Sequence, residues 1–302
     1  MSIPVCADCF KGTLRGNVIP TGHEDVIHGL PTYMATPEWH TKPLGTVVLI
    51  TDAFGWSLRN TRALADSYAK RVPCIVYVPE FMDGKALPLS LMASFEAKPD
   101  PNSPWIFRIL SRTWNIIKAV PLFIAWLYRT RPSVAWPRVR SFIAAVRSTP
   151  TAQGTPPKVG VAGFCWGGLY AVGLTNTLNP DNWVTLDGGN KVPLIDCAFT
   201  AHPSMLKLPK HIEQLGERGD DSFMGTEKMK EVQRILKDKN RTSREAQGAD
   251  KLTMPNMHEI VVYPGAKHGF AVRGDREDPL QKERGDKSED QAVLWFSAWF
   301  AA

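Results

Sequence analysis

One segment of the sequence has the residue types and spacing that nucleophilic catalysis requires, the hexapeptide GFCWGG at residues 163–168. It follows a β-branched run at 158–162 and leads into a predicted helix from about Gly167. Such a sharp turn between strand and helix is a nucleophile elbow, which lifts its central side chain above the carboxyl edge of a sheet. Glycines two positions before and after let the backbone segments approach without a clash. We therefore predict that Cys165 is a nucleophile; the alternative is a tight glycine turn around an inert, buried cysteine.

The predicted chemistry is acyl transfer to sulfur. The N-terminus of the helix behind Cys165 favours negative charge, so it would stabilise a thiolate. The backbone N–H of Trp166 points to where the oxyanion of a tetrahedral intermediate would form. The elbow thus predicts an enzyme that transfers an acyl group first to Cys165 and then to water.

An elbow nucleophile needs a histidine base, which comes after the nucleophile and the acid in the chain order of this fold. Of 7 histidines, His202, His211, His258 and His268 follow Cys165. We predict His268 as the base, because it follows the expected strand 259–263 at the carboxyl edge, where ligands bind. His202 also follows a strand and is the rival candidate. His258 begins a strand and would face the opposite edge.

The segments around these residues alternate between strand and helix patterns. Apolar runs typical of buried strands lie at 46–51, 74–78, 158–162, 194–200 and 259–263. Helical spacing follows at 60–71, from about 167, at 227–237 and at 288–300, and residues 25–36 predict two short extended segments around Gly29. Strands that alternate with helices predict an α/β fold with a mostly parallel sheet flanked by helices.

The composition fits a globular enzyme of one domain, residues 1–302. Hydrophobic residues make up 43% and charged residues 22%, which excludes a disordered or coiled-coil chain. Residues 88–150 break the alternation with helical spacing at 105–118 and 139–146, so we expect a helical insertion over the sheet edge. Residues 246–257 predict a polar surface loop. The net charge of +6 is mild and spread along the chain, so we expect no nucleic-acid partner.

Targeting, metal and cofactor signals are weak or absent in the sequence. We expect a cytoplasmic protein without a secretory signal or membrane partner, because the apolar run 119–128 is half the length of a spanning helix; interfacial attachment stays open. Five cysteines predict no disulfide framework, and the CxxC of Cys6 and Cys9 lacks a second pair for a metal site. No P-loop, GxGxxG or HExxH motif is present, so we predict no cofactor and no metal.

In these motifs the chain resembles the dienelactone hydrolase family, and within it the fungal branch. The matching segments are CADCFKG, IHGLPTYMATP, ITDAFGW, VPEFMDG, GFCWGG, AHPS, VYPGAKHGFAVRGD and QAVLWF. The resemblance implies an α/β-hydrolase fold and a cysteine triad that opens lactones or small esters, with Cys165 as nucleophile and His268 as base. It also implies that Asp52, where relatives often have glutamate, contacts the thiol and couples its ionisation to substrate binding.

The same resemblance suggests the remaining binding groups. The loop around Ala53 would supply a second oxyanion N–H. Arg273 lies one residue beyond the position of a carboxylate-binding arginine in the family, and the alternative is a solvated loop charge. Arg273 or Lys85 would meet the carboxylate of a flat, apolar substrate.

The acid is the point where the sequence departs from the family pattern. The family has an apolar strand before the acid, and here that strand is missing or reduced, which would fit a mispredicted splice junction or a degenerate paralogue. Alignment backwards from the helix at 227–237 selects Asp221 as the acid, with Asp220 as the alternative. Both aspartates could instead be N-cap residues of that helix.

We therefore expect a hydrolase that opens a small lactone or ester through a thioester acyl-enzyme, in fungal secondary metabolism or aromatic degradation. One alternative is a hydrolase of thioesters or esters of a polyketide-like acid. Another is a degenerate, non-catalytic scaffold, motivated by the weak acid region. The sequence predicts a small-molecule partner and no oligomeric state.

Overall fold

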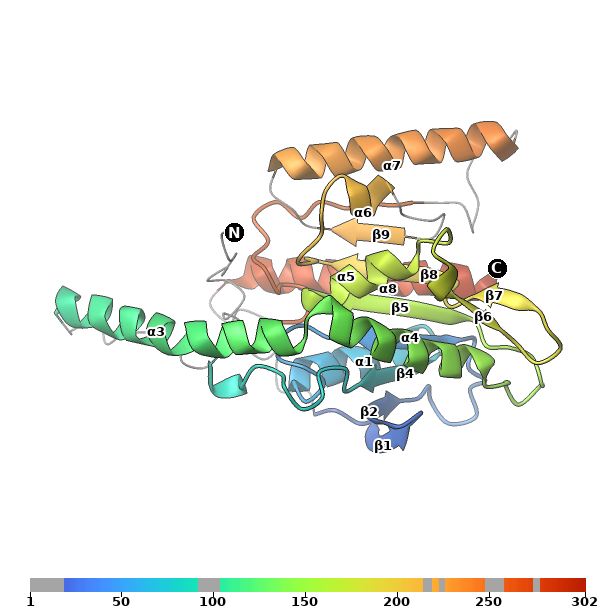
Figure 1. The fold of residues 1–302 in the computed structure, drawn as a ribbon, viewed down its shortest axis with the longest axis horizontal. Coiled ribbons are helices and arrows are strands. Elements are labelled where there is room, and N and C mark those ends of the chain that lie inside the picture. Colours follow the sequence, from blue (N-terminus) through green and yellow to red (C-terminus); the bar gives the residue numbers. More distant parts are fainter. Residues whose placement is uncertain (1–18, 92–103, 214–218, 223–225, 248–257, 274–277) are drawn as a thin grey trace.

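The main sheet has seven strands in the computed structural model, which describes residues 19–91, 104–213, 219–222, 226–247, 258–273 and 278–302. Their order is β1-β2-β4-β3-β5-β8-β9 (Figure 1). The bounds are β1 His23–Ile27, β2 Leu30–Ala35, β3 Thr46–Ile50, β4 Ile75–Pro79, β5 Val159–Phe164, β8 Cys197–Ala201 and β9 Gly219–Ser222. Strand β2 runs antiparallel to β1 and β4, whereas β4, β3, β5, β8 and β9 are parallel. This arrangement confirms the predicted α/β class.

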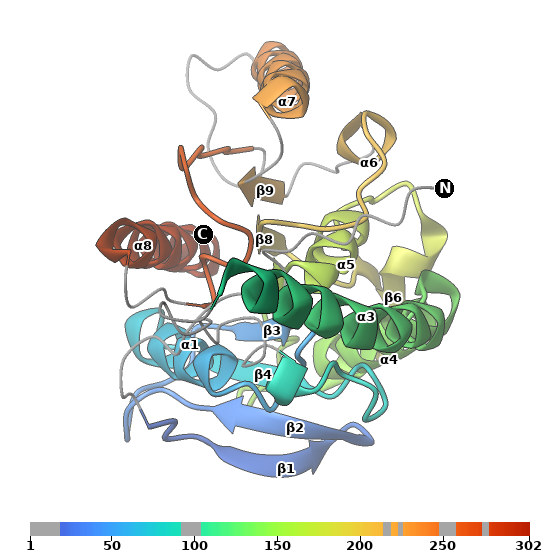
Figure 2. The same cartoon turned by 90° about the vertical axis from the view of Figure 1, so that its left-hand side faces the viewer.

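Helices cover both faces of this sheet. Figure 2 shows α1 (Arg59–Arg71) and α8 (Pro279–Ala301) on one side, and α4 (Pro132–Ser148) and α5 (Trp166–Leu174) on the other. The remaining elements are α3 Trp105–Arg129, the 3-10 turn η2 Pro180–Asn182, the hairpin strands β6 Trp183–Thr185 and β7 Lys191–Pro193, α6 Lys210–Glu213 and α7 Thr226–Gln247. Because both faces are covered, every residue of β3, β5 and β8 is buried.

The predicted helical insertion is present as α3 and α4, which follow the carboxyl end of β4. Its inner side is anchored on the sheet and on α5. The indole Nε1 of Trp166 donates to the carbonyl of Thr130 between the two helices, at 3.3 Å. Arg138 of α4 donates to the carbonyl of Phe81, just after β4. The insertion therefore packs directly against the helix that begins at the elbow.

The strand expected at 259–263 was a wrong prediction, because this segment has no regular secondary structure. The side chain of Asn240 on α7 bonds both the N–H and the carbonyl of His258, at 3.0 and 2.8 Å. Ile260 packs with a small apolar cluster on α5, α6 and α7. The segment is thus held by a helix rather than by a neighbouring strand.

The strand before the acid, expected to be missing or reduced, is present in reduced form as the four residues of β9. It pairs in parallel with β8, and Asp221 lies opposite Thr200. Asp220 and Asp221 are therefore strand residues, and the N-cap alternative is wrong because α7 begins only at Thr226. Backbone pairing with a buried neighbour holds this polar sequence in a strand that its composition does not predict.

Two expectations, the CxxC motif and the polar loop, fall partly or wholly outside the described residues. Cys6 and Cys9 lie there, as does most of the loop predicted at 246–257, whose first two residues belong to α7. Within the described part of the chain, no helix is both long and apolar enough to cross a bilayer. One main apolar cluster contains buried residues from Tyr33 to Phe300, which supports our proposal of a single domain.

Candidate active site

Cys165 occupies the turn between β5 and α5, as the elbow motif predicts. Its backbone has φ 50° and ψ −109°, a conformation that non-glycine residues rarely adopt. Cys165 is 5% exposed at the N-terminus of α5, and its sulfur lies 3.4 Å from the hydroxyl oxygen of Ser204. The fold therefore holds a cysteine in a strained position at the N-terminus of a helix.

The glycines of the motif allow this close packing. A Cβ atom on Gly167 would lie 2.0 Å from the carbonyl oxygen of Ile50 on β3. A Cβ atom on Gly163 would lie 2.6 Å from the carbonyl oxygen of Gly167. The N–H of Gly167 also donates to the carbonyl of Thr51, at 3.1 Å, which joins the elbow to the loop that contains Asp52.

Both rival histidines lie in the same cluster. The rings of His202 and His268 are 4.8 Å apart in an edge-to-face arrangement, and His202 directly follows the carboxyl end of β8. His202 is fully buried, has φ 44°, and packs against Phe164 and Phe270. Burial lowers the pKa of His202 well below its usual value, and the nearby His268 lowers it further. His202 is thus a neutral ring beside the predicted base.

The loop that contains His268 is fixed by side chains from two helices. The amide of Gln281 on α8 bonds this loop twice: its oxygen accepts from the N–H of Lys267 and its nitrogen donates to the carbonyl of Gly265, both at 2.9 Å. Asn60, buried at the start of α1, donates to the carbonyl of Val272 at 3.1 Å. The sequence did not predict that Gln281 and Asn60 hold this loop. The role of a polar residue at a buried helix position becomes evident only when its hydrogen-bond partner is known.

Asp52 and Arg273 form a buried ion pair, with Nε of Arg273 3.6 Å from Oδ2 of Asp52. Their side chains are 1% and 2% exposed, and the guanidinium lies over the ring of Phe54. Burial raises the pKa of Asp52, while Arg273 opposes that rise; Cys165 raises it and His268 lowers it. The carboxyl group is therefore electrostatically coupled to the thiol and the histidine.

Arg273 is consequently not the solvated loop charge that the sequence left open. Its guanidinium is already paired with Asp52. The alternative carboxylate-binding residue, Lys85, is exposed in the turn after β4. Two residues later, the N–H of Leu87 donates to the carbonyl of Ala53, so this turn borders the proposed oxyanion loop.

The register of β9 defines how far the acid candidates lie from the cluster. Phe164 pairs with Ala201, and Ala201 pairs with Ser222, so Cys165 and His202 each follow the last paired residue of their strands. Asp221 lies one position before the end of β9. It is therefore two residues short of the level that Cys165 and His202 occupy, or about 6–7 Å along the strand. The backbone of Asp221 thus lies below the carboxyl edge rather than in the loop beyond it.

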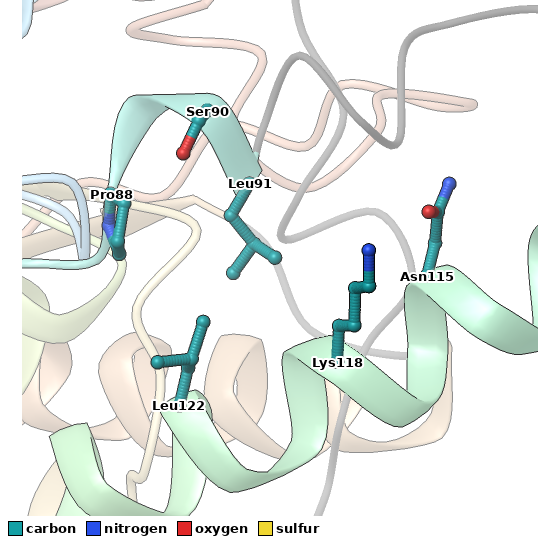
Figure 3. A pocket seen from close by; sticks show the side chains of 6 residues that line it. All are labelled: Pro88, Ser90, Leu91, Asn115, Lys118 and Leu122. Carbon is teal, nitrogen blue, oxygen red and sulfur yellow. The ribbon is translucent and has the colours of Figure 1, made fainter.

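A cavity of about 160 Å³ lies between the turn after β4 and α3. Figure 3 shows Leu91 and Leu122 facing each other across it, with Lys118 at one side. Its lining also includes Pro88, Ser90 and Asn115. Neither Cys165 nor His268 contributes to this lining, so the cavity belongs to the insertion rather than to the reacting groups.

Comparison with known proteins identifies relatives along nearly the whole chain. The model of the dienelactone hydrolase family matches residues 30–203. Hydrolase pyvD of Aspergillus violaceofuscus is 22% identical over 99% of this chain and 98% of its own length. Hydrolase tropI of Talaromyces stipitatus is 24% identical over the same shares.

A solved structure supports the fold. Carboxyl esterase 2 of the mycorrhizal fungus Tuber melanosporum matches 96% of this chain and 90% of its own length, with a TM-score of 0.51 and 10% identity. At this identity the likeness concerns the arrangement of strands and helices.

Proposed function

Because this chain belongs to the dienelactone hydrolase family and is a hydrolase of esters or lactones, we propose that it uses Cys165 as its nucleophile and opens a small lactone or ester. The observation that carries the proposal is the backbone of Cys165, at φ 50° and ψ −109°, whose thiol interacts electrostatically with His202, the ring that lies against His268. Such a conformation costs of the order of 1–3 kcal/mol for a residue with a side chain. An inert cysteine gives no reason for that cost, because glycine would adopt this conformation freely.

In the first half of the proposed reaction, His268 takes the proton of the Cys165 thiol, and the resulting thiolate attacks the carbonyl carbon. The N-terminus of α5 stabilises the thiolate before attack. The N–H groups of Trp166 and Ala53 would donate to the oxyanion. The C–O bond of the lactone then breaks, the acyl group stays on sulfur as a thioester, and the leaving alkoxide takes a proton from the imidazolium of His268.

In the second half, His268 takes a proton from water, and the resulting hydroxide attacks the thioester. Collapse of that intermediate expels the thiolate and releases a hydroxy acid, or an oxo acid if the product is an enol. We keep Asp221 as the proposed acid that orients His268, with Asp220 as the alternative. Asp52 would tune the thiol, because its carboxyl group is buried and coupled to Cys165, His268 and Arg273.

The substrate class follows from the surroundings of this cluster. Phe54, Phe164 and Phe270 make its walls apolar, which favours a small, flat substrate. Since Arg273 is paired with Asp52, a substrate carboxylate would either compete for this arginine or bind the exposed Lys85 at the rim. The fungal relatives support a fungal pathway, but they are named only as hydrolases, so secondary metabolism and aromatic degradation both stay predictions.

The test is hydrolysis of a panel of small lactones, alkyl esters and acyl thioesters by wild type, Cys165→Ala and Cys74→Ala. Cys74 is a matched control because it is also buried, but it lies at the start of β4, the end of the strand opposite the site. We expect Cys165→Ala to lose turnover of every substrate and Cys74→Ala to keep it. Mass spectrometry of the quenched wild-type reaction should find the acyl group on the peptide that contains Cys165.

Three results would redirect the proposal. Full activity of Cys165→Ala would exclude this cysteine as nucleophile. Faster turnover of acyl thioesters than of lactones would favour the alternative substrate, an ester or thioester of a polyketide-like acid. No turnover at all, together with a Cys165 that resists iodoacetamide, would favour a non-catalytic scaffold.

A further inference from the structure

The outer face of α3 carries a stripe of exposed apolar side chains. Figure 1 shows that the N-terminal half of this helix projects beyond the sheet and its covering helices. Residues spaced three and four apart lie on one side of a helix, and on this side they are Ile106, Trp114, Ile117, Pro121, Ile124 and Tyr128. All are exposed, including Trp114 at 57%, Ile117 at 55% and Tyr128 at 69%. The buried residues Ala119, Phe123 and Trp126 lie on the opposite side.

Apolar residues lie on the outer face of this helix as well as on its buried inner face. The inner face of α3 packs on the rest of the molecule. The rings of Phe123 and Trp126 lie 5.3 Å apart, and the indole N–H of Trp126 donates a hydrogen bond to the sulfur of Met82. The outer face has no such support from the described part of the chain. Monomeric soluble proteins rarely expose large contiguous apolar patches, and patches of this kind mark interaction surfaces.

The charges around the stripe identify the chemistry of its partner. Residues 101–180 contain nine Lys and Arg and no Asp or Glu, and five of the nine lie on α3 or two residues after it. Three others, on α4, are paired with aspartates. The remainder of the chain is slightly acidic, so the positive charge is concentrated here and is not spread along the chain as we expected from the total. Lys118 lies over the ring of Trp114 at 5.1 Å, and Arg131 lies over the ring of Tyr128 at 4.4 Å. Cations therefore flank exposed aromatic rings along this helix.

A second copy of this chain is a poor occupant for this surface. Two such helices would bring like charges together, since α3 has no acidic residue to pair with them. An anionic lipid surface fits both features: basic residues attract its headgroups, and Trp, Tyr and Ile insert at the boundary between headgroups and acyl chains. The helix does not meet the requirements of a membrane span, so it would lie in the plane of the surface.

We propose that the outer face of α3 docks this hydrolase on anionic phospholipid membranes. The helix has 25 residues, so about 37 Å of its length would lie along the surface. The cavity of Figure 3 lies along a neighbouring side of α3, and Lys118 is the lining residue nearest to the stripe. Docking would thus bring the insertion, rather than β1 or α8, next to the lipid.

The experiment is flotation of the full chain with vesicles of phosphatidylcholine alone or with phosphatidylserine added. Trp114→Glu/Ile117→Glu disrupts the stripe. Trp39→Glu/Leu294→Glu is the matched control, because Trp39 is 87% and Leu294 72% exposed elsewhere on the surface. Thermal melting and hydrolysis of a water-soluble ester establish that all proteins are folded, since none of these residues belongs to the site.

We expect wild type and the control to float with anionic vesicles, and the stripe variant to lose about tenfold or more of its binding. High salt and neutral vesicles should weaken wild-type binding, because attraction to the lipid charge is screened. Equal binding of both variants, or no wild-type binding, would overturn the proposal. A wild-type dimer in light scattering that only the stripe variant dissociates would assign the surface to a second copy instead.

Discussion

The double contact of Gln281 with the histidine loop leads to a sharp prediction for Gln281→Leu. The replacement keeps a side chain of similar size at a buried position of α8 and removes both hydrogen bonds to the loop, each 2.9 Å long. Gly265 and Lys267 are exposed, so water can replace the lost partners. Each bond then costs about 0.5–1.5 kcal/mol, which gives roughly 1–3 kcal/mol in total. For a chain of this size that corresponds to a fall in Tm of about 2–6 °C.

The effect on catalysis should be larger than the effect on stability. His268 comes directly after Lys267, so a loosened loop misplaces the base. A displacement of about 1 Å can reduce the rate 10²-fold. We therefore expect kcat for a small ester to fall by about 10- to 100-fold at 25 °C, where the variant remains folded. Alkylation of Cys165 by iodoacetamide, followed by peptide mass spectrometry, provides a second readout that needs no substrate.

Gln291→Leu is the matched control on the same helix. Gln291 is also buried, and its amide oxygen accepts a bond from the side-chain hydroxyl of Tyr263, at 3.1 Å. We expect a small fall in Tm and a kcat close to wild type. Gln281→Glu keeps the acceptor for Lys267 and should lie between wild type and Gln281→Leu. If the two leucine variants reduce kcat equally, or Gln281→Leu lowers Tm without lowering kcat, the reasoning about the loop is wrong.

Two further predictions concern the elbow and the second histidine. Gly167→Ala should prevent the elbow from forming, because the added Cβ would lie 2.0 Å from a backbone oxygen. We expect a strongly reduced Tm and no turnover. Near-normal activity would contradict this packing. Burial lowers the pKa of His202 in the folded protein, so the unfolded chain binds this proton more readily. The contribution of His202 to the free energy of unfolding is therefore fully present above the unfolded pKa of about 6.5, and it is lost as pH falls below that value. His202→Phe should therefore reduce the dependence of unfolding free energy on pH below about 6.5, by at most about 1.4 kcal/mol per pH unit. An unchanged slope in urea titrations at different pH would refute this.

The sequence determined the parts of this protein that depend on local pattern. Continuous β-branched runs predicted the central strands, since a strand covered on both faces needs apolar residues at every position. The hexapeptide at 163–168 predicted the elbow, because its glycines are the only residues that fit the close approach of β3 and the backbone of α5. Both features are encoded within a few neighbouring residues.

Pairing across the chain was decided only by the tertiary structure. The motif after the expected strand 259–263 favoured His268, but contact in space placed His202 against it, although the two are 66 residues apart in the sequence. The sequence left open whether Arg273 binds a substrate carboxylate or is a loop charge, and only the fold revealed its partner Asp52. The sequence also left helix caps as an alternative for the aspartates of β9, because strand pairing is an interaction with β8 and not a property of the sequence GDDS. The sequence of a segment determines its local conformational preference. Burial, ion pairing and strand register depend instead on distant residues that the fold brings together.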